Sequence, residues 1–482
     1  MLRLPGPAVP LAASERYALE LLADLARLVP VDDPAADVVR VDVPEDPGNP
    51  GSLTAVAAHG WHLTVHDGAV AVPRSVLRLV AGVATARAER QSTARDRHGR
   101  VPPAANAVVA EALERDPVVS RAARSLRDAV VRAAGSRPVY LAVPWPAGRR
   151  WAAAVTHDLD VASWWPLFTG LRLAELVGKG ELGRTLRVLG AAAGAVAGDP
   201  VTAGAAALLE DEAAGGVPST WFIICGTPTV ATFAAGDVTY LPEARRASDI
   251  VRAAAAGGHA IGLHGSFATT DSGGAFTAER RRLEALTARP VAGVRQHFLR
   301  FQPLVTHRAM AEAGFTYDTS YGFPDRNGFR LGVADVMPLW DEDAGRGIGL
   351  DEAPVAWMDR ALSKYRAVES PDVWVDDALA LAAVCREVDG LWVGVWHPNL
   401  VPALGFPGAP AAFRRLLRDL GAHDPCFGTL DQLVAWRRAR RAVRVRALAE
   451  DGRVEVTGAG DLAVPLETPS AAPVRGIAPA PR

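Results

Sequence analysis

From Gly216 to about Gly421, strand-like apolar runs alternate with helical segments, and this alternation limits the possible folds more than any other sequence feature. The strand-like runs lie at 217–225, 259–265, 290–298, 315–320 and 391–398, and an earlier one lies at 151–160. Strands that alternate with helices are typical of a parallel sheet. Because so many such units follow one another, we expect an α/β fold, either a (β/α) barrel or a distorted version of one.

The pattern divides the chain into three predicted parts. Residues 1–148 form an N-terminal α/β accessory domain, and residues 149–440 form the catalytic domain. Within the latter, 161–214 is a helical insertion without strand signals, and it is either a lid or groove wall beside the site or an extra packing layer. The remainder, 441–482, contains two alternating runs that predict a β-hairpin, followed by a Pro/Ala-rich end that we expect to be disordered.

The accessory domain is predicted from its own local patterns. Helical spacing and short strand-like runs separated by Pro, Gly and Asn both occur in it. The helices are expected at 15–29, 75–90, 104–113 and 118–133, and the strands at 38–43, 53–59, 62–68, 69–73 and 139–141.

Composition excludes several classes of protein. The 52 Lys and Arg nearly balance the 54 Asp and Glu, so no basic field points to a nucleic-acid partner. The three cysteines, Cys225, Cys385 and Cys426, lack metal-ligand spacing and are too few for a disulfide framework. No convincing signal peptide or transmembrane segment is present. These features predict a soluble cytoplasmic protein.

Polar residues end the predicted strands, beginning with Trp151–Asp160, whose buried run finishes in two aspartates. Since side chains alternate along a strand, Asp158 and Asp160 should share one face. Two adjacent carboxylates repel each other, so a cation or a shared proton is expected between them. Later strands end in His264, in Arg295 with His297, in Asp318 and in His397. In such folds the carboxyl ends of the strands form the active site.

These residues form two candidate groups. The trio Asp160, His264 and His297 suits Zn²⁺ with open coordination positions, although a strand-end Asp can cap a helix and a strand-end His can be a satisfied core residue. In the second group, Asp158 is placed as a general base beside a metal-activated water, and Arg295 would hold it ionised. His397 would act as the proton donor; its alternative is packing beside Trp396.

Several stretches resemble, in order and spacing, the motifs of the polysaccharide deacetylase superfamily. They are Thr156–Asp160 (THDLD), Gly258–His264 (GHAIGLH), Arg295 and His397, and the similarity spans roughly 151–436. The resemblance implies a distorted (β/α) barrel and a divalent metal that activates water to hydrolyse an N- or O-acetyl group. By the same resemblance Asp158 is the base, Asp160 and His264 bind the metal, Arg295 orients the base, and His397 is the acid.

The chain also departs from that pattern. The family has a second histidine four residues after the first, and here that position is Ala268; the two aspartates are commonly adjacent, and here Leu159 separates them. Because Arg295 and His297 are two residues apart on a predicted strand, we expect both to point into the site, with His297 replacing the missing ligand.

The resulting expectation is a metal-dependent deacetylase or amide hydrolase acting on a non-peptide C–N bond, with an acylated amino sugar or other carbohydrate as substrate. Asp318, Arg330 and Trp396 are candidate substrate-binding residues, and Trp164 and Trp165 are further candidates for stacking on a sugar. Two alternatives remain open: a hydrolase of a small non-sugar amide, favoured by a narrow pocket, and a metal-free carbohydrate-binding or scaffold protein, favoured by the absent histidine.

Overall fold

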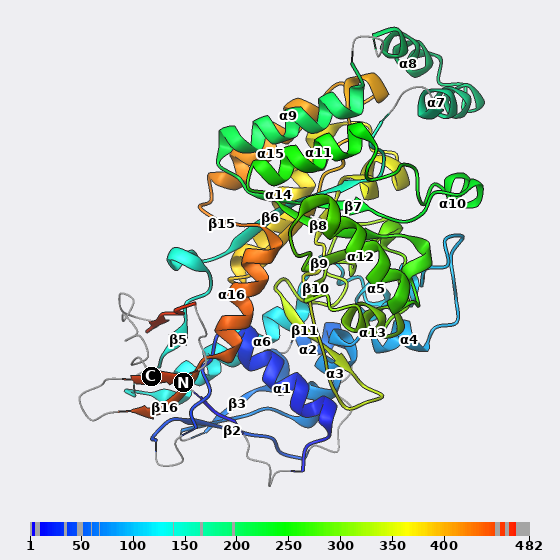
Figure 1. Ribbon diagram of the computed structural model, residues 1–482. Helices are drawn as coiled ribbons and strands as arrows, with labels where there is room; N and C mark the ends of the chain where they lie inside the picture. The colour runs from blue at the N-terminus through cyan, green and yellow to red at the C-terminus, as the bar shows by residue number, and fades with distance from the viewer. Residues whose placement is uncertain are drawn as a thin grey trace.

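The computed structural model of the chain (Figure 1) describes residues 2–4, 10–32, 36–45, 52–58, 60–66, 68–137, 139–163, 167–194, 198–448, 454–457 and 462–468. A ten-stranded sheet forms its centre, in the order β11-β12-β10-β9-β8-β7-β6-β14-β13, with β15 pairing beside β6. Its strands are β6 (Ala152–Leu159), β7 (Ser219–Ile224), β8 (Ala260–Gly265), β9 (Gly293–Gln296), β10 (Tyr317–Asp318), β11 (Met337–Asp341), β12 (Arg346–Glu352), β13 (Trp357–Met358), β14 (Leu391–Val395) and β15 (Cys426–Phe427).

All neighbouring strands of this sheet are parallel except β11, which pairs antiparallel with β12. The predicted parallel α/β sheet is therefore confirmed, and the carboxyl ends of its strands meet at one edge. A closed barrel is not formed, because no described strand joins β11 to β13. The sheet is a curled, open version of the predicted barrel.

Alternating residues of the central strands enter two different cores. In β6, Ala153 and Val155 pack in one hydrophobic cluster with residues of the surrounding helices, whereas Ala152 and Ala154 belong to a second cluster that includes Phe222. All eight residues of β6 are buried, as expected for a parallel strand covered on both faces. The covering helices are α9 (Pro200–Gly215), α11 (Arg245–Ala256), α12 (Gly273–Thr287), α13 (Val305–Glu312), α14 (Pro371–Glu387), α15 (Ala409–Gly421) and α16 (Leu430–Ala442).

The predicted insertion consists of α7 (Leu167–Gly178), α8 (Leu182–Gly194) and α9. Helix α9 packs against α11 and α15, and α8 packs against the turn at Pro402–Leu404, while the outer parts of α7 and α8 extend beyond the body (Figure 1). Asp199 accepts the N–H groups of Val201 and Thr202 at the start of α9 and pairs with Arg246 at 2.9 Å. The insertion is thus both a packing layer, through α9, and a projecting helix pair.

Short helical elements connect the strands of both halves of the chain. They are α10 (Val230–Ala234) and the turns η1 (Gly60–His62), η2 (Pro103–Ala105), η3 (Pro146–Gly148), η4 (Phe267–Thr269), η5 (His297–Leu299), η6 (Ala361–Tyr365) and η7 (Pro402–Leu404).

The N-terminal region has its own four-stranded sheet, in the order β1-β2-β4-β3, at the opposite end of the molecule from α7 and α8 (Figure 1). Its strands are β1 (Leu2–Arg3), β2 (Val39–Asp42), β3 (Thr64–His66) and β4 (Ala69–Ala71). Its helices are α1 (Ala13–Leu25), α2 (Leu53–Ala58), α3 (Arg74–Ala84), α4 (Arg87–Gln91), α5 (Ala107–Ala110) and α6 (Val118–Ala134).

One predicted strand of this region is wrong, because residues 53–58 form helix α2. The carboxylate of Glu111 accepts the N–H groups of Leu53 (3.0 Å) and Thr54 (2.9 Å), and Ser52 Oγ accepts that of Ala55 (3.1 Å). These acceptors satisfy donors that a helix start otherwise leaves unpaired. A contact 58 residues away in the chain therefore decided the local structure.

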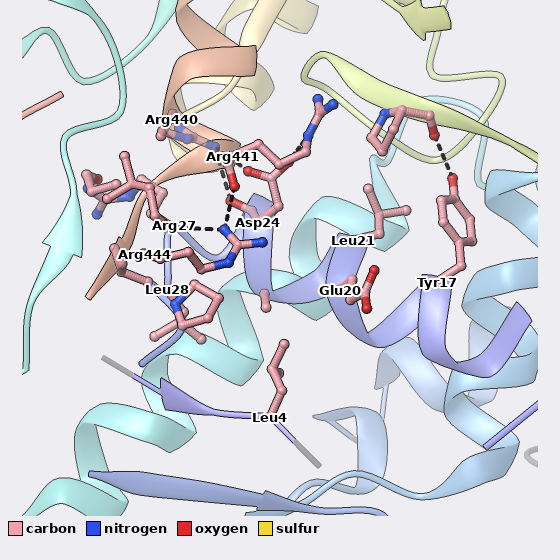
Figure 2. Close-up of a pocket in the computed structure, with 16 residues that line it drawn as sticks. Leu4, Tyr17, Glu20, Leu21, Asp24, Arg27, Leu28, Arg440, Arg441 and Arg444 are labelled. Carbon is pink, nitrogen blue, oxygen red and sulfur yellow. Dashed lines mark hydrogen bonds and ion pairs between the residues drawn. The ribbon is translucent and has the colours of Figure 1, made fainter. Parts of the chain in front are cut away.

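Helix α16 packs against α1 and ties the end of the chain to its beginning. Figure 2 shows the cavity of about 130 Å³ between them, with Asp24, Arg440 and Arg441 on its wall. Asp24 accepts from Arg437 Nη1 at 3.1 Å and from Arg441 Nε at 3.0 Å, and its carbonyl accepts from Arg440 Nη2 at 3.1 Å. Asp24, Arg440 and Arg441 on this wall therefore form one ion-paired group that joins α16 to α1.

Beyond α16, β16 (Arg444–Leu448) pairs antiparallel with β17 (Val454–Thr457), and β18 (Leu466–Glu467) pairs with β5 (Leu141–Ala142). The predicted turn at 449–453 and the predicted disordered end lie outside the described residues. Within the part of the chain that the structure describes, no helix has the length and apolar character needed to cross a bilayer.

Candidate metal centre

Three strand ends bring the predicted metal-binding trio together. Asp160 directly follows β6, His264 lies in β8, and His297 directly follows β9. Asp160 Oδ1 is 3.4 Å from His264 Nε2 and 3.5 Å from His297 Nε2. The potential ligand atoms of all three lie within 4.8 Å of one another. The side chains therefore converge although 137 residues separate Asp160 from His297.

The second nitrogen of each histidine ring is already engaged. His264 Nδ1 donates to the carbonyl oxygen of Arg295 at 2.9 Å, and His297 Nδ1 lies 3.3 Å from Asp237 Oδ1. Such contacts place the ring proton on Nδ1 and leave the Nε2 lone pair facing Asp160. Asp160 Oδ1 is itself buried and has no hydrogen-bond partner among the described residues. One carboxylate oxygen and two imidazole nitrogens that face each other in this way fit a divalent ion.

Asp158 lies beside the trio and is held by Arg295. Arg295 Nη1 donates to Asp158 Oδ1 at 2.6 Å, while Asp158 Oδ2 lies 3.7 Å from His264 Nε2. Arg295 is fully buried, is fixed by Thr156 Oγ1 (2.9 Å) and the Thr319 carbonyl (3.1 Å), and stacks over Phe222. Burial would raise the pKa of Asp158, but Arg295 foremost, then His264 and His397, outweigh burial and hold this pKa below its ordinary value.

His397 also lies beside the trio and follows β14, the neighbour of β6 on the side away from β7. Its Nε2 is 3.5 Å from Asp160 Oδ2, and its Nδ1 bonds Asp359 Oδ1 at 2.6 Å. Asp359 also accepts the His397 backbone N–H at 2.6 Å, so one carboxylate fixes both the ring and the backbone. Burial would lower the pKa of His397, but Asp359 foremost, and then Asp160, outweigh burial and raise it. The raised pKa suits a group that gives up a proton near neutral pH.

These groups line a cavity of about 210 Å³, which we call the site cavity. Its walls are completed by Phe298, Leu299, Met358 and Tyr365. A wider cavity of about 540 Å³ adjoins it and shares Arg360, Lys364 and Asn399 with it, while α7 and the start of α8 form its outer wall. The predicted insertion thus takes part in the surroundings of the site.

Three residues predicted to bind substrate do not line either cavity. Asp318 is fully buried, and Arg330 and Trp396 are 3% and 2% exposed. Arg330 makes a buried ion pair with Glu89, at 2.9 Å from Nε to Oε1 and 2.6 Å from Nη2 to Oε2. This placement corrects the prediction, since a substrate in the cavity does not reach these side chains. Trp164 and Trp165 lie outside the described residues.

Asp318 belongs to a second buried group, with His307 and Glu352. His307 Nδ1 accepts the N–H of Leu304 at 3.3 Å, so the ring proton lies on Nε2, which faces Asp318 Oδ2 at 3.3 Å. A ring in this tautomer has no free lone pair for a metal. Burial foremost, and then Asp318, raise the pKa of Glu352 well above its ordinary value. Three atoms of this group, His307 Nε2, Asp318 Oδ2 and Glu352 Oε2, are buried without a hydrogen-bond partner among the described residues.

Sequence reasoning missed two carboxylates and misplaced one backbone segment. Asp359 ends the apolar run Val355–Met358, so the strand-end rule used for the other residues would have found it. Asp237 lies in a loop between α10 and α11, where no pattern marks it. His297 begins turn η5 instead of continuing the strand, and Phe298 after it has φ 58°. Ala268, at the family's second histidine position, is exposed in η4.

Asp237 provides a test of the His297 geometry. We expect Asp237→Asn to weaken zinc binding about 10-fold, the lower end of the usual effect of groups that orient a metal-binding histidine. Asp341→Asn, which alters an aspartate that pairs with Arg308 and lies outside both cavities, is the control and should leave affinity unchanged. Competition with a zinc-chelating dye measures both. Equal affinities for the two variants would show that Asp237 does not orient a ligand.

Comparisons with known proteins complete the description of the site. No family model matches the chain, and no curated protein matches it. Among solved structures, a Mycobacterium smegmatis protein named as a polysaccharide deacetylase is 23% identical, with a TM-score of 0.43, covering 64% of this chain and 96% of that one. Puue allantoinase is 16% identical, with a TM-score of 0.40 and coverage of 62% and 93%. A wild-type CE4 family pseudoenzyme from Bacillus anthracis is 11% identical, with a TM-score of 0.31 and coverage of 59% and 65%. The functional conclusion rests on the geometry of the site.

Proposed function

We propose that this chain is a metal-dependent hydrolase that removes an acyl group from a small acylated compound, with N-acyl amino sugars the first class to test. The observation that carries the proposal is the convergence of Asp160, His264 and His297 around an unpartnered carboxylate oxygen. Asp158 and His397 both lie beside this trio, and each is fixed by its own charged partner. A ligand set flanked by a base and an acid is the arrangement that amide and ester hydrolysis needs.

Each side chain has a separate task in this proposal. A divalent ion bound by the trio would polarise the acyl carbonyl and lower the pKa of a water molecule. Asp158, kept ionised by Arg295, takes the proton of the attacking water. His397, charged with the help of Asp359, protonates the departing amine or alkoxide. Arg295 and Asp359 keep the two groups in opposite protonation states, so that both can act in one turnover.

The size of the site supports a small substrate. The site cavity of about 210 Å³ and the adjoining wider cavity of about 540 Å³ are partly open to solvent, with α7 and the start of α8 on the outer wall. Volumes of about 300–1,000 Å³ are usual for small-molecule sites. A small amide that is not a sugar therefore remains the second candidate, and the comparison of acylated sugars with simple acyl amides separates the two.

The first experiment is metal analysis combined with hydrolysis assays. Purified protein should contain close to one divalent ion, and His264→Ala should lose both the ion and the activity with only a modest change in stability, as for an open catalytic site. A crystal structure with zinc should show a His297 ring nitrogen within about 2.3 Å of the ion. If wild-type protein contains no metal and does not bind added zinc, the enzymatic proposal fails and the metal-free binding protein takes its place.

A further inference from the structure

Two cations stand at the border between the two cavities without a carboxylate partner. Arg360 and Lys364 line both the site cavity and the wider cavity. Within the described residues, no carboxylate oxygen lies within 4.0 Å of either charged group. Arg360 Nη2 donates to Asn399 Oδ1 at 2.9 Å, and Lys364 Nζ lies 5.4 Å from the ring centre of Phe298. Arg360 is half-buried and Lys364 is exposed at the edge of the cavities, and both have hydrogen-bonding capacity to spare.

The other cations around the cavities are paired. Arg172 and Lys179 bind Glu175 at 2.6 and 2.7 Å. Arg184 binds Glu181 at 2.8 Å, and on the site side Arg100 binds Asp96 at 2.7 Å. Arg360 and Lys364 thus differ from their neighbours. An unpaired cation on an open surface is ordinary, but two of them in a concavity beside a reaction centre attract an anion strongly.

Arg360 and Lys364 would hold a bound anion next to the proposed catalytic residues. Asp359 holds His397, and Arg360 is the next residue in the chain. Their Cα atoms are therefore about 3.8 Å apart. Lys364 lies one turn further on, in the π-helical turn η6. Such turns are rare and occur frequently at functional sites. Both side chains also line the site cavity together with the metal-binding trio.

We propose that Arg360 and Lys364 bind an oxyanion of the substrate, a phosphate or a carboxylate, so that the compound hydrolysed here is an anionic acyl derivative. The inference rests on the proposed function and names its substrate class. Five cations but only two carboxylates line the wider cavity, which therefore has a positive field. The guanidinium of Arg360 matches the geometry of either oxyanion, and the cavity of about 540 Å³ has room for the group attached to it.

The test compares neutral and anionic substrates that share one acylamide. The probes are N-acetylglucosamine, N-acetylglucosamine 1-phosphate for a phosphate, and N-acetylmuramic acid for a carboxylate. We expect kcat/KM for one of the anionic probes to exceed that for the neutral probe at least about 10-fold, the usual size of a charge-assisted contact. Arg360→Gln should reduce this preference about 10-fold, mainly through KM, and Arg360→Lys should restore part of it.

A paired cation of the same cavity supplies the control. Arg184→Gln removes a charge that Glu181 already neutralises. Because partly exposed ion pairs contribute little, this variant should change the kcat/KM preference for the anionic probe less than about twofold. An equal loss in Arg184→Gln and Arg360→Gln would mean that only the general field matters, and it would overturn the assignment of a specific oxyanion site.

A binding measurement keeps this inference separate from the hydrolysis proposal. Calorimetric titration with glucosamine 1-phosphate and with glucosamine needs no turnover. Wild-type protein should bind glucosamine 1-phosphate at least about 10-fold more tightly than glucosamine. This difference in affinity should be lost in Arg360→Gln. Equal hydrolysis of neutral and anionic probes would overturn the inference while leaving the hydrolase intact. Absent hydrolysis with preserved, Arg360-dependent phosphate binding would overturn the hydrolase and keep the oxyanion site. No difference in binding between wild type and Arg360→Gln would overturn the oxyanion site.

Discussion

Replacing Asp158 by asparagine is expected to lower kcat by about 10²-fold or more while the protein still binds one divalent ion. In the wild-type protein Arg295 donates a hydrogen bond to Asp158 Oδ1 at 2.6 Å. The asparagine amide oxygen can accept the same hydrogen bond, so the local structure should persist. An amide cannot take a proton from water, and the base is therefore lost without loss of the metal. Single-turnover kinetics together with metal analysis of the same sample measure both quantities.

Asp160→Asn is the matched comparison, because the two aspartates flank Leu159 and both lie near His264. Its expected phenotype is the reverse: weakened metal binding, with activity partly restored by excess zinc. Should Asp158→Asn lose the metal and Asp160→Asn keep it, the roles assigned to the two carboxylates would have to be exchanged.

Replacing Arg330 by methionine is expected to lower the free energy of unfolding by about 3–5 kcal/mol, the usual cost of leaving one buried charge without its partner. Glu89 is 1% exposed and receives two hydrogen bonds from Arg330, and Arg330 also donates to the Gly322 carbonyl at 2.8 Å. The guanidinium stacks over Phe301, with 4.8 Å to the ring centre. Urea-induced unfolding measures the change.

The double variant Arg330→Met/Glu89→Met is the control for this prediction. It removes both charges, and it should be more stable than Arg330→Met alone, because no unpaired carboxylate remains in the core. Wild-type stability of Arg330→Met combined with a raised KM would instead support the substrate-binding role that the sequence suggested.

The parts of the site that the sequence predicted all follow from one local rule. An apolar run that ends in a polar residue marks the carboxyl end of a buried strand, and parallel pairing brings such ends together. That rule identified Asp158, Asp160, His264, Arg295 and His397, and the structure places them around one cavity or directly behind its wall. Their chemical roles remain predictions until the variants are measured.

The residues that this rule missed or misassigned are determined by contacts between distant parts of the chain. Asp318 also ends a strand, but β12 lies beside it and Glu352 pairs in register with it, which keeps it in the core. The partner of Arg330 is Glu89, 241 residues earlier in the chain, and no local pattern indicates such a pair. Asp237 reaches His297 from a loop whose path is set by the surrounding fold. The boundaries of the three predicted domains likewise remain a prediction.

The contact between Asp24 in α1 and Arg437 in α16 has a consequence for synthesis. These two residues are 413 positions apart, and Arg437 is fully buried in the native protein. At translation rates of about 5–20 residues per second, roughly 20–80 s pass between the emergence of α1 and that of its partner helix. During that interval the side of α1 that later faces α16 is uncovered and Asp24 has no counterion from it. The N-terminal region therefore reaches its final packing only after α16 has been synthesised.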